Sequence, residues 1–427
     1  MIYDTLVVGA GLAGLTTALR LTEQGQKFVI VARGVGATHL APATVDVLGY
    51  LGEERVDSPA SALTTLLSDV PGHPYGRVSR EQLGASLEWF CRRLERLGYA
   101  GGLDHNRLFP TAIGVARPSA LAPRTMLGGD LRDGGRFLFV GLRGFKDFHP
   151  SLLADNLAHA RLPAPVTARA LELEPPAERR GDLSGRLLAR RFDSGELTDW
   201  LVRALQGRVE AEERVGLPPV LGLRRADETL ADLENRLERR VFEVPTLPPS
   251  IPGMRLYDTL TAALRRAGAR LVINAAVVGA QAHDGQIEAV QVASAATTMS
   301  YRTHSVVLAS GGFASGGLTL DSRGTARETV FDLPVAGVPE EGATRFVAGY
   351  FDAQPLSRAG VAVDDLLRPT GRDGGPVYRN LHAAGAILAG AVPWKEKSGT
   401  GISVATGYAA ADAILVPSAM GVSGSIG

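Results

Sequence analysis

Three glycines near the start of the chain have the spacing of a phosphate-binding turn. Gly9, Gly11 and Gly14 follow the apolar run 3–8 and precede a segment with helical spacing of apolar residues up to Gly25. Gly9 permits a tight turn, Gly11 has no Cβ to keep a phosphate from the backbone, and Gly14 lets the helix approach the strand. The free N–H groups and the helix dipole then favour an anion. An ordinary strand-to-helix turn without a ligand is the alternative.

The second strand, Phe28–Val31, lacks the acidic residue that usually binds the ribose hydroxyls of a dinucleotide. Ala32 stands at that position and Arg33 follows it. This argues against a standard NAD site and weakens the case for the adenosine half of FAD. Arg33 suits a phosphate, either that of a mononucleotide or the extra phosphate of NADP. A solvated surface arginine explains it equally well.

His39 and Arg255 are the residues that we expect to act on a substrate. His39 lies in a glycine loop after the second strand, where open α/β sheets bind ligands, and an imidazole takes a proton near neutral pH. Arg255 begins a helix just beyond a proline-rich run, and its guanidinium can hold a phosphate with two hydrogen bonds. Arg143 and Lys146 are second choices for this anchor. A histidine bonded only to a backbone carbonyl, and solvated charges on a turn, are the alternatives.

Composition excludes several classes of protein. The 427 residues carry 45 Lys and Arg against 45 Asp and Glu, with no basic block, so we expect no nucleic-acid partner. Cys91 is the single cysteine, which excludes an internal disulfide and a cysteine-ligated iron–sulfur cluster built by this chain alone. We expect no metal site, no signal peptide before the first strand, and no membrane span, because the longest candidate, Ala383–Val392, is too short.

The order of periodic segments predicts an α/β protein with a doubly wound, Rossmann-like domain interrupted by an inserted α+β cap. Strand patterns dominate both ends of the chain, whereas helical periodicity dominates the middle. We place the first part of the base domain at 1–55, the cap or substrate domain at 56–249, and the remaining base at 250–427. Residues 319–373 are assigned to the cap as an alternative. Asp284-Gly285 predicts a hairpin turn between two of the later strands.

Two further glycine motifs end buried strands in the second half of the chain. Gly311 and Gly312 follow the strand 305–309, and a strand near residue 383 closes on Gly385. The run 398–407 then leads into a helix from Tyr408 to Leu415. A glycine loop at a helix N-terminus stabilises anions and electron-rich ring edges. It would therefore stabilise negative charge on a reduced flavin ring.

In this order, the motifs resemble the flavoprotein fold of fumarate reductase and related dehydrogenases. That resemblance covers the whole chain and implies that its two ends fold together around a non-covalent flavin, while the middle covers a substrate. The flavin should bind at the first turn, after the second strand and at the later glycines. The expected cofactor-binding residues are Gly9, Gly11, Leu12, Ala13, Gly14, Arg33, Gly34, Thr38, Gly311, Gly312, Gly385, Gly399, Gly401 and Ile402.

A closer resemblance is to the family of B subunits of anaerobic glycerol-3-phosphate dehydrogenase. It rests on four stretches and on the Ala32-Arg33 ending; the stretches are Thr38–Leu40, Gly144–Phe148, Leu217–Leu223 and Glu243–Ser250. The resemblance implies FMN, with FAD as the alternative, and a complex with a second flavoprotein subunit and an iron–sulfur subunit at the membrane. It also implies oxidation of sn-glycerol 3-phosphate, a small phosphorylated substrate, to dihydroxyacetone phosphate, with electrons passed to quinone. The chain would be cytoplasmic and peripheral on the cytoplasmic membrane through a partner.

Within this interpretation His39 is the expected general base and Arg255 the expected phosphate anchor. Two other functions stay open. One is a non-catalytic flavin relay or assembly subunit of the same complex, since no residue of the insert is an unmistakable base. The other is a stand-alone NADPH-dependent flavin reductase with Arg33 on the extra phosphate.

Overall fold

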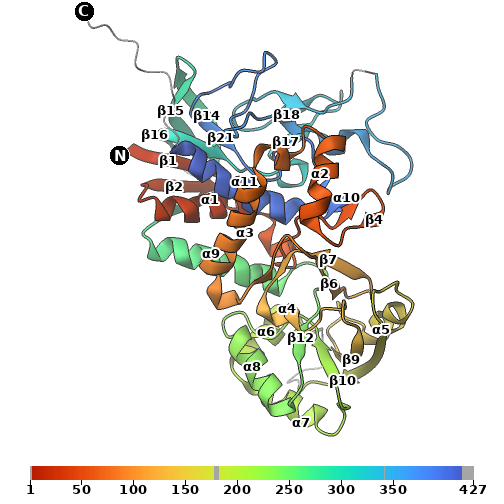
Figure 1. The fold of residues 1–427 in the computed structure, drawn as a ribbon. Coiled ribbons are helices and arrows are strands. Elements are labelled where there is room, and N and C mark those ends of the chain that lie inside the picture. Colours follow the sequence, from red (N-terminus) through yellow and green to blue (C-terminus); the bar gives the residue numbers. More distant parts are fainter. Residues whose placement is uncertain (1, 177–181, 296, 341, 416–427) are drawn as a thin grey trace, which may run out of the picture.

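The computed structural model describes residues 2–176, 182–295, 297–340 and 342–415, and these form two lobes (Figure 1). The upper lobe in the view holds the large sheet and both ends of the described chain. The lower lobe comes from the middle of the sequence. Each lobe has its own cluster of buried apolar side chains. The predicted α/β fold class is confirmed.

The upper lobe is organised around a seven-stranded sheet. Its strands run in the order β13-β2-β1-β16-β15-β14, and β21 pairs with the end of β16. Pairing is parallel except at β14 and β15, which form a hairpin. The bounds are β1 Ile2–Val8, β2 Phe28–Ala32, β13 Arg270–Ile273, β14 Ala276–His283, β15 Gln286–Ala293, β16 Thr298–Leu308 and β21 Leu381–Ala383. The run Phe28–Ala32 is buried throughout, as expected for a parallel strand covered on both faces.

Four helices build the upper lobe around this sheet: α1 Leu12–Glu23, α3 Arg80–Arg93, α9 Ile251–Arg266 and α11 Gly399–Ile414. Helix α1 packs against α11 and α9, although α11 is nearly four hundred residues away in sequence. Thr17 fixes this contact because its hydroxyl donates to the carbonyl of Gly407 at 2.9 Å. Gly407 permits the close approach, since a Cβ there would lie 2.6 Å from the carbonyl oxygen of Ala13.

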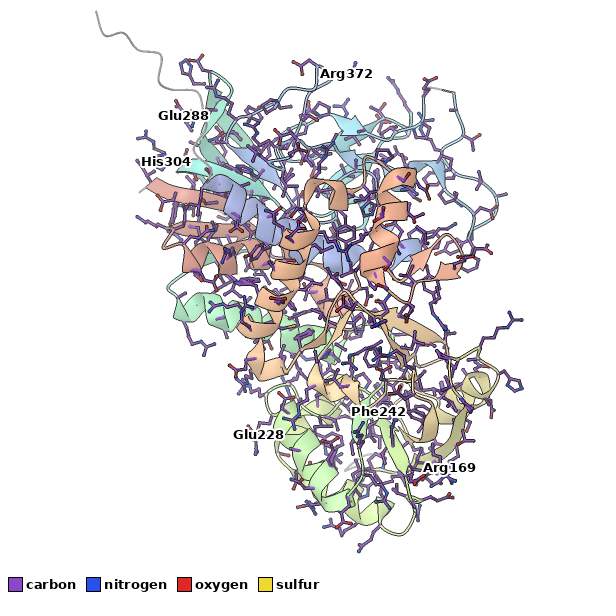
Figure 2. The ribbon with its side chains drawn as sticks, viewed as in Figure 1. Arg169, Glu228, Phe242, Glu288, His304 and Arg372 are labelled. Atoms are coloured by element: carbon purple, nitrogen blue, oxygen red, sulfur yellow. The ribbon has the colours of Figure 1, made fainter. Side chains whose placement is uncertain are left out.

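The lower lobe contains a four-stranded parallel sheet in the order β10-β9-β11-β12. Its core includes Phe137, Phe139 and Phe242, whose rings stack or meet edge to face at 5.9–6.1 Å. Figure 2 shows Phe242 inside this lobe. The bounds are α4 Arg124–Leu127, β9 Gly135–Leu142, α5 Pro150–Ala158, β10 Val166–Leu173, α6 Gly185–Asp193, α7 Glu196–Leu205, β11 Glu213–Leu217, α8 Ala226–Leu237 and β12 Val241–Glu243.

The smaller elements lie outside these two sheets. The remaining helices are α2 Pro59–Asp69 and α10 Pro393–Glu396, with 3₁₀ turns η1 Gly36–Leu40, η2 Pro74–Arg77, η3 Glu95–Leu97, η4 Phe313–Ser315 and η5 Pro355–Arg358. Short strand pairs are β3 Tyr50–Leu51 with β4 Glu54–Arg55, β5 Ala100–Gly101 with β8 Leu121–Ala122, β6 Arg107–Pro110 with β7 Ala116–Ser119, β17 Leu318–Leu320 with β18 Ala326–Glu328, and β19 Val335–Ala336 with β20 Gly360–Val361. Among the described residues, no helix has the length and apolarity to span a membrane.

The buried core of the lower lobe begins at Leu108, well after the boundary predicted at residue 56. Helix α3 instead belongs to the upper lobe, where Trp89 meets Tyr408 of α11 edge to face at 5.4 Å. Val56, Leu63 and Phe90 join the same upper core. The helical periodicity of 56–97 gave the element type, but it carried no information about which core the apolar face would join.

Two local expectations were wrong. Helix α11 begins at Gly399 rather than at Tyr408, so residues 399–407 of the predicted glycine loop form the first half of the helix. The glycine loop that contains His39 is a 3₁₀ turn, η1. In both places the glycine content of the sequence favoured a flexible loop over a helical turn. Tertiary packing overrides that weak propensity, because a Cβ on Gly401 would lie 2.5 Å from the hydroxyl of Tyr75 and only glycine fits the helix there.

His382 on β21 should make the stability of the fold depend on pH. Its side chain is 4% exposed and its Nδ1 donates to the carbonyl of Leu366 at 2.8 Å. Burial lowers the pKa of His382 below its ordinary value, since the charged imidazolium loses water. The unfolded chain therefore binds this proton at higher pH than the folded chain does. The free energy of unfolding should be highest above about pH 6.5 and should decrease as the pH falls below that value.

Chemical denaturation between about pH 5 and 8 measures this dependence, with His382→Asn as the comparison. Asparagine can keep the bond to Leu366 but does not titrate, so its curve should be flatter below about pH 6.5. Curves of equal slope for the two proteins would show that His382 does not carry the effect.

Candidate cofactor and substrate site

The two helix N-termini of the upper lobe face one cavity of about 780 Å³. The turn between β1 and α1 contributes residues 8–13, and residues 397–400 with Ser403 come from the start of α11. Neither helix has an acidic residue in its first turn. Both N-termini thus present positive dipole ends to the cavity, which suits a ligand with negative or electron-rich groups.

Glycine is required at the β1–α1 turn for three separate reasons. Gly9 has φ +111° and its Cβ would lie 2.2 Å from the carbonyl oxygen of Ala309. A Cβ on Gly14 would lie 2.1 Å from the carbonyl oxygen of Gly9, so this glycine seats the helix on the turn. Gly11 differs, since a Cβ there meets no atom within 4 Å. The missing side chain of Gly11 leaves room for a ligand in the cavity, whereas Gly9 and Gly14 leave room for neighbouring protein atoms.

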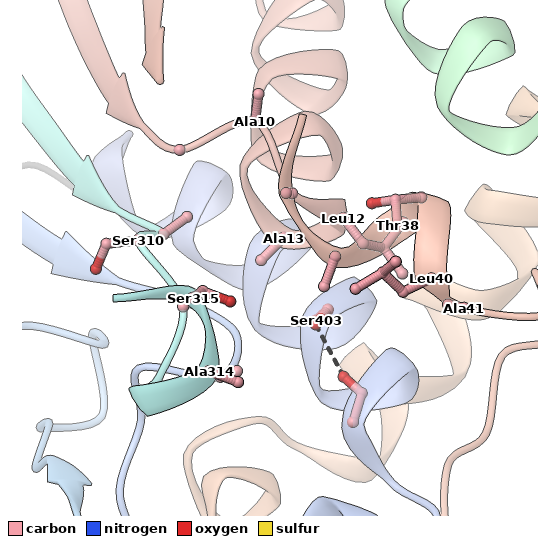
Figure 3. Close-up of a pocket in the computed structure, with 18 of the residues that line it drawn as sticks. Ala10, Leu12, Ala13, Thr38, Leu40, Ala41, Ser310, Ala314, Ser315 and Ser403 are labelled. Atoms are coloured by element: carbon pink, nitrogen blue, oxygen red, sulfur yellow. Dashed lines mark hydrogen bonds between the residues drawn. The ribbon is translucent and has the colours of Figure 1, made fainter. Parts of the chain in front are cut away.

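Four hydroxyl or carboxylate oxygens of the lining are buried and have no hydrogen-bond partner among the described residues. They are Oγ1 of Thr38, Oγ1 of Thr44, Oγ of Ser310 and Oδ1 of Asp46. Figure 3 shows Thr38 and Leu40 on one side of the N-terminal turn of α1, Ser310 and Ser315 on the other, and Ser403 on α11. Buried polar atoms are normally paired. The three hydroxyls converge on one cavity and indicate a polar ligand there, and the residues present therefore fit a flavin.

The cavity extends to both sides of the glycine turn. On one side it reaches Arg33 and Gly34 after β2 and residues 275–277 at the start of β14. On the other side it reaches Thr44 and the start of α11. The lining therefore runs from the segments after β2 and β13 to the start of α11, and Gly11 is part of it.

Nine of the fourteen residues predicted to bind the cofactor line this cavity: Gly9, Gly11, Leu12, Ala13, Arg33, Gly34, Thr38, Gly311 and Gly399. Five do not line it: Gly14, Gly312, Gly385, Gly401 and Ile402. Those glycines instead allow close packing. At Gly385, with φ +80°, a Cβ would lie 2.7 Å from the Cβ of Ala13, and at Gly312 it would lie 2.8 Å from the carbonyl oxygen of Ala386. Glycine content alone did not distinguish a ligand-facing position from a packing position.

The structure does not place His39 in the cavity, which corrects its assignment as the base. Its ring packs edge-on against Tyr257 of α9 at 4.8 Å, and its buried Nε2 has no hydrogen-bond partner among the described residues. Burial lowers the pKa of His39. The charge of Arg186 lowers this pKa further, and the charge of Asp258 raises it. Thr38, its neighbour on η1, faces the cavity instead. The 3₁₀ turn therefore points the imidazole toward α9.

Arg255 is also not at the cavity, which corrects its assignment as the phosphate anchor. It is 5% exposed, and its Nη1 and Nη2 each donate to Glu243 of β12 at 2.6 Å. Its Nε donates to the carbonyl of Gly222. This buried bidentate pair joins α9 to the sheet of the lower lobe. The second-choice anchors are both exposed and paired, Arg143 with Glu174 and Lys146 with Asp182.

Three charged residues that the sequence analysis did not select line the cavity near the start of α11: Asp46, Arg117 and Lys397. Asp46 is 3% exposed, and its Oδ2 accepts a hydrogen bond from Nη2 of Arg117 on β7. Asp46 lies in an irregular segment. No local sequence pattern links the three positions. The one available signal was a charged residue directly beside a glycine motif, as Lys397 is beside the run 398–401.

The backbone of Asp46 is tied to α11. Its N–H donates to Oγ1 of Thr400 at 2.8 Å, and its carbonyl accepts from the N–H of Gly401 at 2.9 Å. The side chain of Asp46 is therefore held at the α11 end of the cavity. Among the described residues there is no group of three or more metal-ligating side chains.

A model of the FAD-binding domain family matches residues 4–402 of this chain. The probable B subunit of anaerobic glycerol-3-phosphate dehydrogenase from Halobacterium salinarum is 34% identical over 423 residues, 96% of this chain and 97% of that protein. The B subunit of anaerobic glycerol-3-phosphate dehydrogenase from Yersinia pseudotuberculosis is 32% identical over 430 residues, 97% and 98% of the two chains. Among solved structures, 3-ketosteroid Δ1-dehydrogenase from Sterolibacterium denitrificans is 13% identical, with 97% and 99% coverage and a TM-score of 0.46.

Proposed function

The chain belongs to the FAD-binding domain family and, within it, to the B subunits of anaerobic glycerol-3-phosphate dehydrogenase, and from this premise we propose its function. It is a flavoprotein subunit that takes part in the oxidation of sn-glycerol 3-phosphate to dihydroxyacetone phosphate. Electrons leave through partner subunits to quinone. The observation that carries this proposal is the cavity with its two helix N-termini and its unpaired buried oxygens.

FAD is the proposed cofactor. The matching family model is an FAD-binding domain and does not support FMN as the first choice. A lining that runs from the segment after β2 to the start of α11 supports the dinucleotide as well. Gly11 and the N-terminus of α1 would hold the phosphates, and the start of α11 would lie at the ring. The bound flavin would supply the acceptor of two electrons.

The proposed partners are a second flavoprotein subunit and an iron–sulfur subunit at the cytoplasmic membrane. The names of the relatives support a multi-subunit complex. The single cysteine means that this chain needs another subunit for any cysteine-ligated cluster. A relay role without substrate chemistry is the second candidate, favoured by the position of His39 outside the cavity.

Release and identification of the cofactor test the proposal. The full chain, purified in the dark, should have a flavin absorption spectrum, and denaturation should release FAD, identified by mass, at about one per chain. Anaerobic addition of NADPH should leave the spectrum oxidised. Release of FMN would overturn the choice of cofactor. A colourless chain that takes up neither flavin would overturn the function.

A further inference from the structure

The cluster formed by Asp46, Arg117 and Lys397 has unused bonding capacity that faces the cavity. Oδ1 of Asp46 and Nε of Arg117 are buried and have no hydrogen-bond partner among the described residues. The Lys397 ammonium has no carboxylate within 4.0 Å in the part of the chain that the structure describes. With two cations and one carboxylate, the cluster carries a net charge of +1. It offers one free cation and one free carboxylate oxygen to a ligand.

Lys397 is held in place by the residues around its stem. It has φ +51°, and a Cβ on Gly49 would lie 2.9 Å from the Cβ of Lys397, so the lysine packs on that glycine. Burial and the charge of Arg117 lower the pKa of Lys397, while Asp46 raises it. An anion beside this ammonium would therefore relieve its repulsion from Arg117.

A buried hydrogen-bond network fixes the segment before α11. Glu396 accepts from the N–H of Val392 and the hydroxyl of Ser398, both at 2.9 Å, and contacts Nε2 of His73 at 3.2 Å. Nδ1 of His73 accepts from the N–H of Tyr75, so the proton is on Nε2 and donates to Glu396. The carbonyl of Glu396 accepts from Gly49 at 2.8 Å. Lys397 thus emerges from a rigid segment.

We propose that Asp46, Arg117 and Lys397 form a binding site, within this subunit, for a small phosphorylated alcohol. Lys397 contacts the phosphate, Oδ1 of Asp46 accepts the hydrogen bond of the reacting hydroxyl, and Arg117 holds the carboxylate of Asp46. This inference rests on the proposed function and assigns the substrate contact to this chain rather than to a partner. A carboxylate in this position can also accept the hydroxyl proton.

The oxidation then balances within the site. With a flavin bound, Asp46 would take the hydroxyl proton of the alcohol. The flavin would supply the acceptor for the hydrogen that leaves the same carbon as hydride, so that a carbonyl group forms in the product. The quinone of the proposed complex is the final oxidant, and the proton on Asp46 returns to water when the product leaves.

The decisive variant is Lys397→Met, which removes the charge, keeps a long apolar stem and leaves no carboxylate unpaired. Lys395→Met is the matched control, because Lys395 lies two residues away over the ring of Trp394 and does not line the cavity. Calorimetry with the flavin-loaded full chain measures binding of sn-glycerol 3-phosphate, with glycerol and inorganic phosphate as separate ligands. Lys397→Met should weaken binding of glycerol 3-phosphate about tenfold or more at unchanged flavin content. Lys395→Met should bind as the parent does.

Asp46→Asn tests the hydroxyl contact separately. It should bind glycerol 3-phosphate within a few-fold of the parent, whereas anaerobic reduction of the flavin by substrate should slow by about a hundredfold or more. A flavin-loaded parent that binds no glycerol 3-phosphate, or equal binding by Lys397→Met, would overturn this inference and leave the flavoprotein function intact. Absence of flavin from the parent would instead refute the proposed function.

Discussion

Gly11→Val should yield a folded protein that has lost nearly all of its flavin. A Cβ at residue 11 meets no protein atom within 4 Å, and its φ of −77° and ψ of −178° are extended backbone that valine adopts readily. The side chain would therefore enter the cavity without straining the turn. It would occupy the place where a phosphate approaches the N–H groups of α1. Absorbance of the purified variant at the flavin bands, per chain, measures the loss.

Gly279→Val is the control for this prediction. Gly279 on β14 also has open space at its Cβ, but it does not line the cavity. It should keep the flavin content of the parent, and both variants should give the parent's far-UV circular dichroism. Normal flavin content in folded Gly11→Val would show that the phosphate does not approach at this turn.

Arg255→Met should destabilise the protein by about 3–5 kcal/mol, because it leaves a buried carboxylate without its partner. Glu243 is 1% exposed, and the N–H of Leu221 also donates to its carboxylate at 2.9 Å. That single bond does not replace the two lost from the guanidinium. Urea unfolding followed by circular dichroism measures the change.

Two comparisons separate this role from phosphate binding. Arg265→Met removes an exposed arginine from the same helix and should change stability by no more than about 0.5 kcal/mol. Arg255→Met combined with Glu243→Gln removes both charges, so part of the lost stability should return. If Arg255→Met is as stable as Arg265→Met but binds glycerol 3-phosphate poorly, Arg255 is the phosphate anchor after all, as the sequence predicted.

The cofactor-binding end of the fold could be predicted because its signals are local. The strand, the glycine turn and α1 follow one another within the first 23 residues, and the turn needs glycine for backbone reasons. The hairpin of β14 and β15 is equally local, since Asp284 and Gly285 both have positive φ. Gly11 and Gly399 were predicted to share one site, and they line the same cavity.

The direction of individual side chains could not be predicted in the same way. His39 was placed beside the ligand because it follows the second strand, yet the phase of a 3₁₀ turn decides whether Thr38 or His39 faces the cavity. That phase is set by α9, where Gly253 packs on the carbonyls of Thr38 and Ala41. Such a contact is made by residues more than two hundred positions apart.

The sequence by itself determined the fold class, the position of the glycine turn and the family. These follow from short-range backbone chemistry and from the order of the motifs along the chain. Only the tertiary structure decided which charges are free and which are paired. Arg255 meets Glu243 from another lobe, whereas Lys397 meets no acid among the described residues. Asp46 reaches Arg117 across 71 residues and α11 across 354, because long-range packing brings these segments together and no local spacing encodes it.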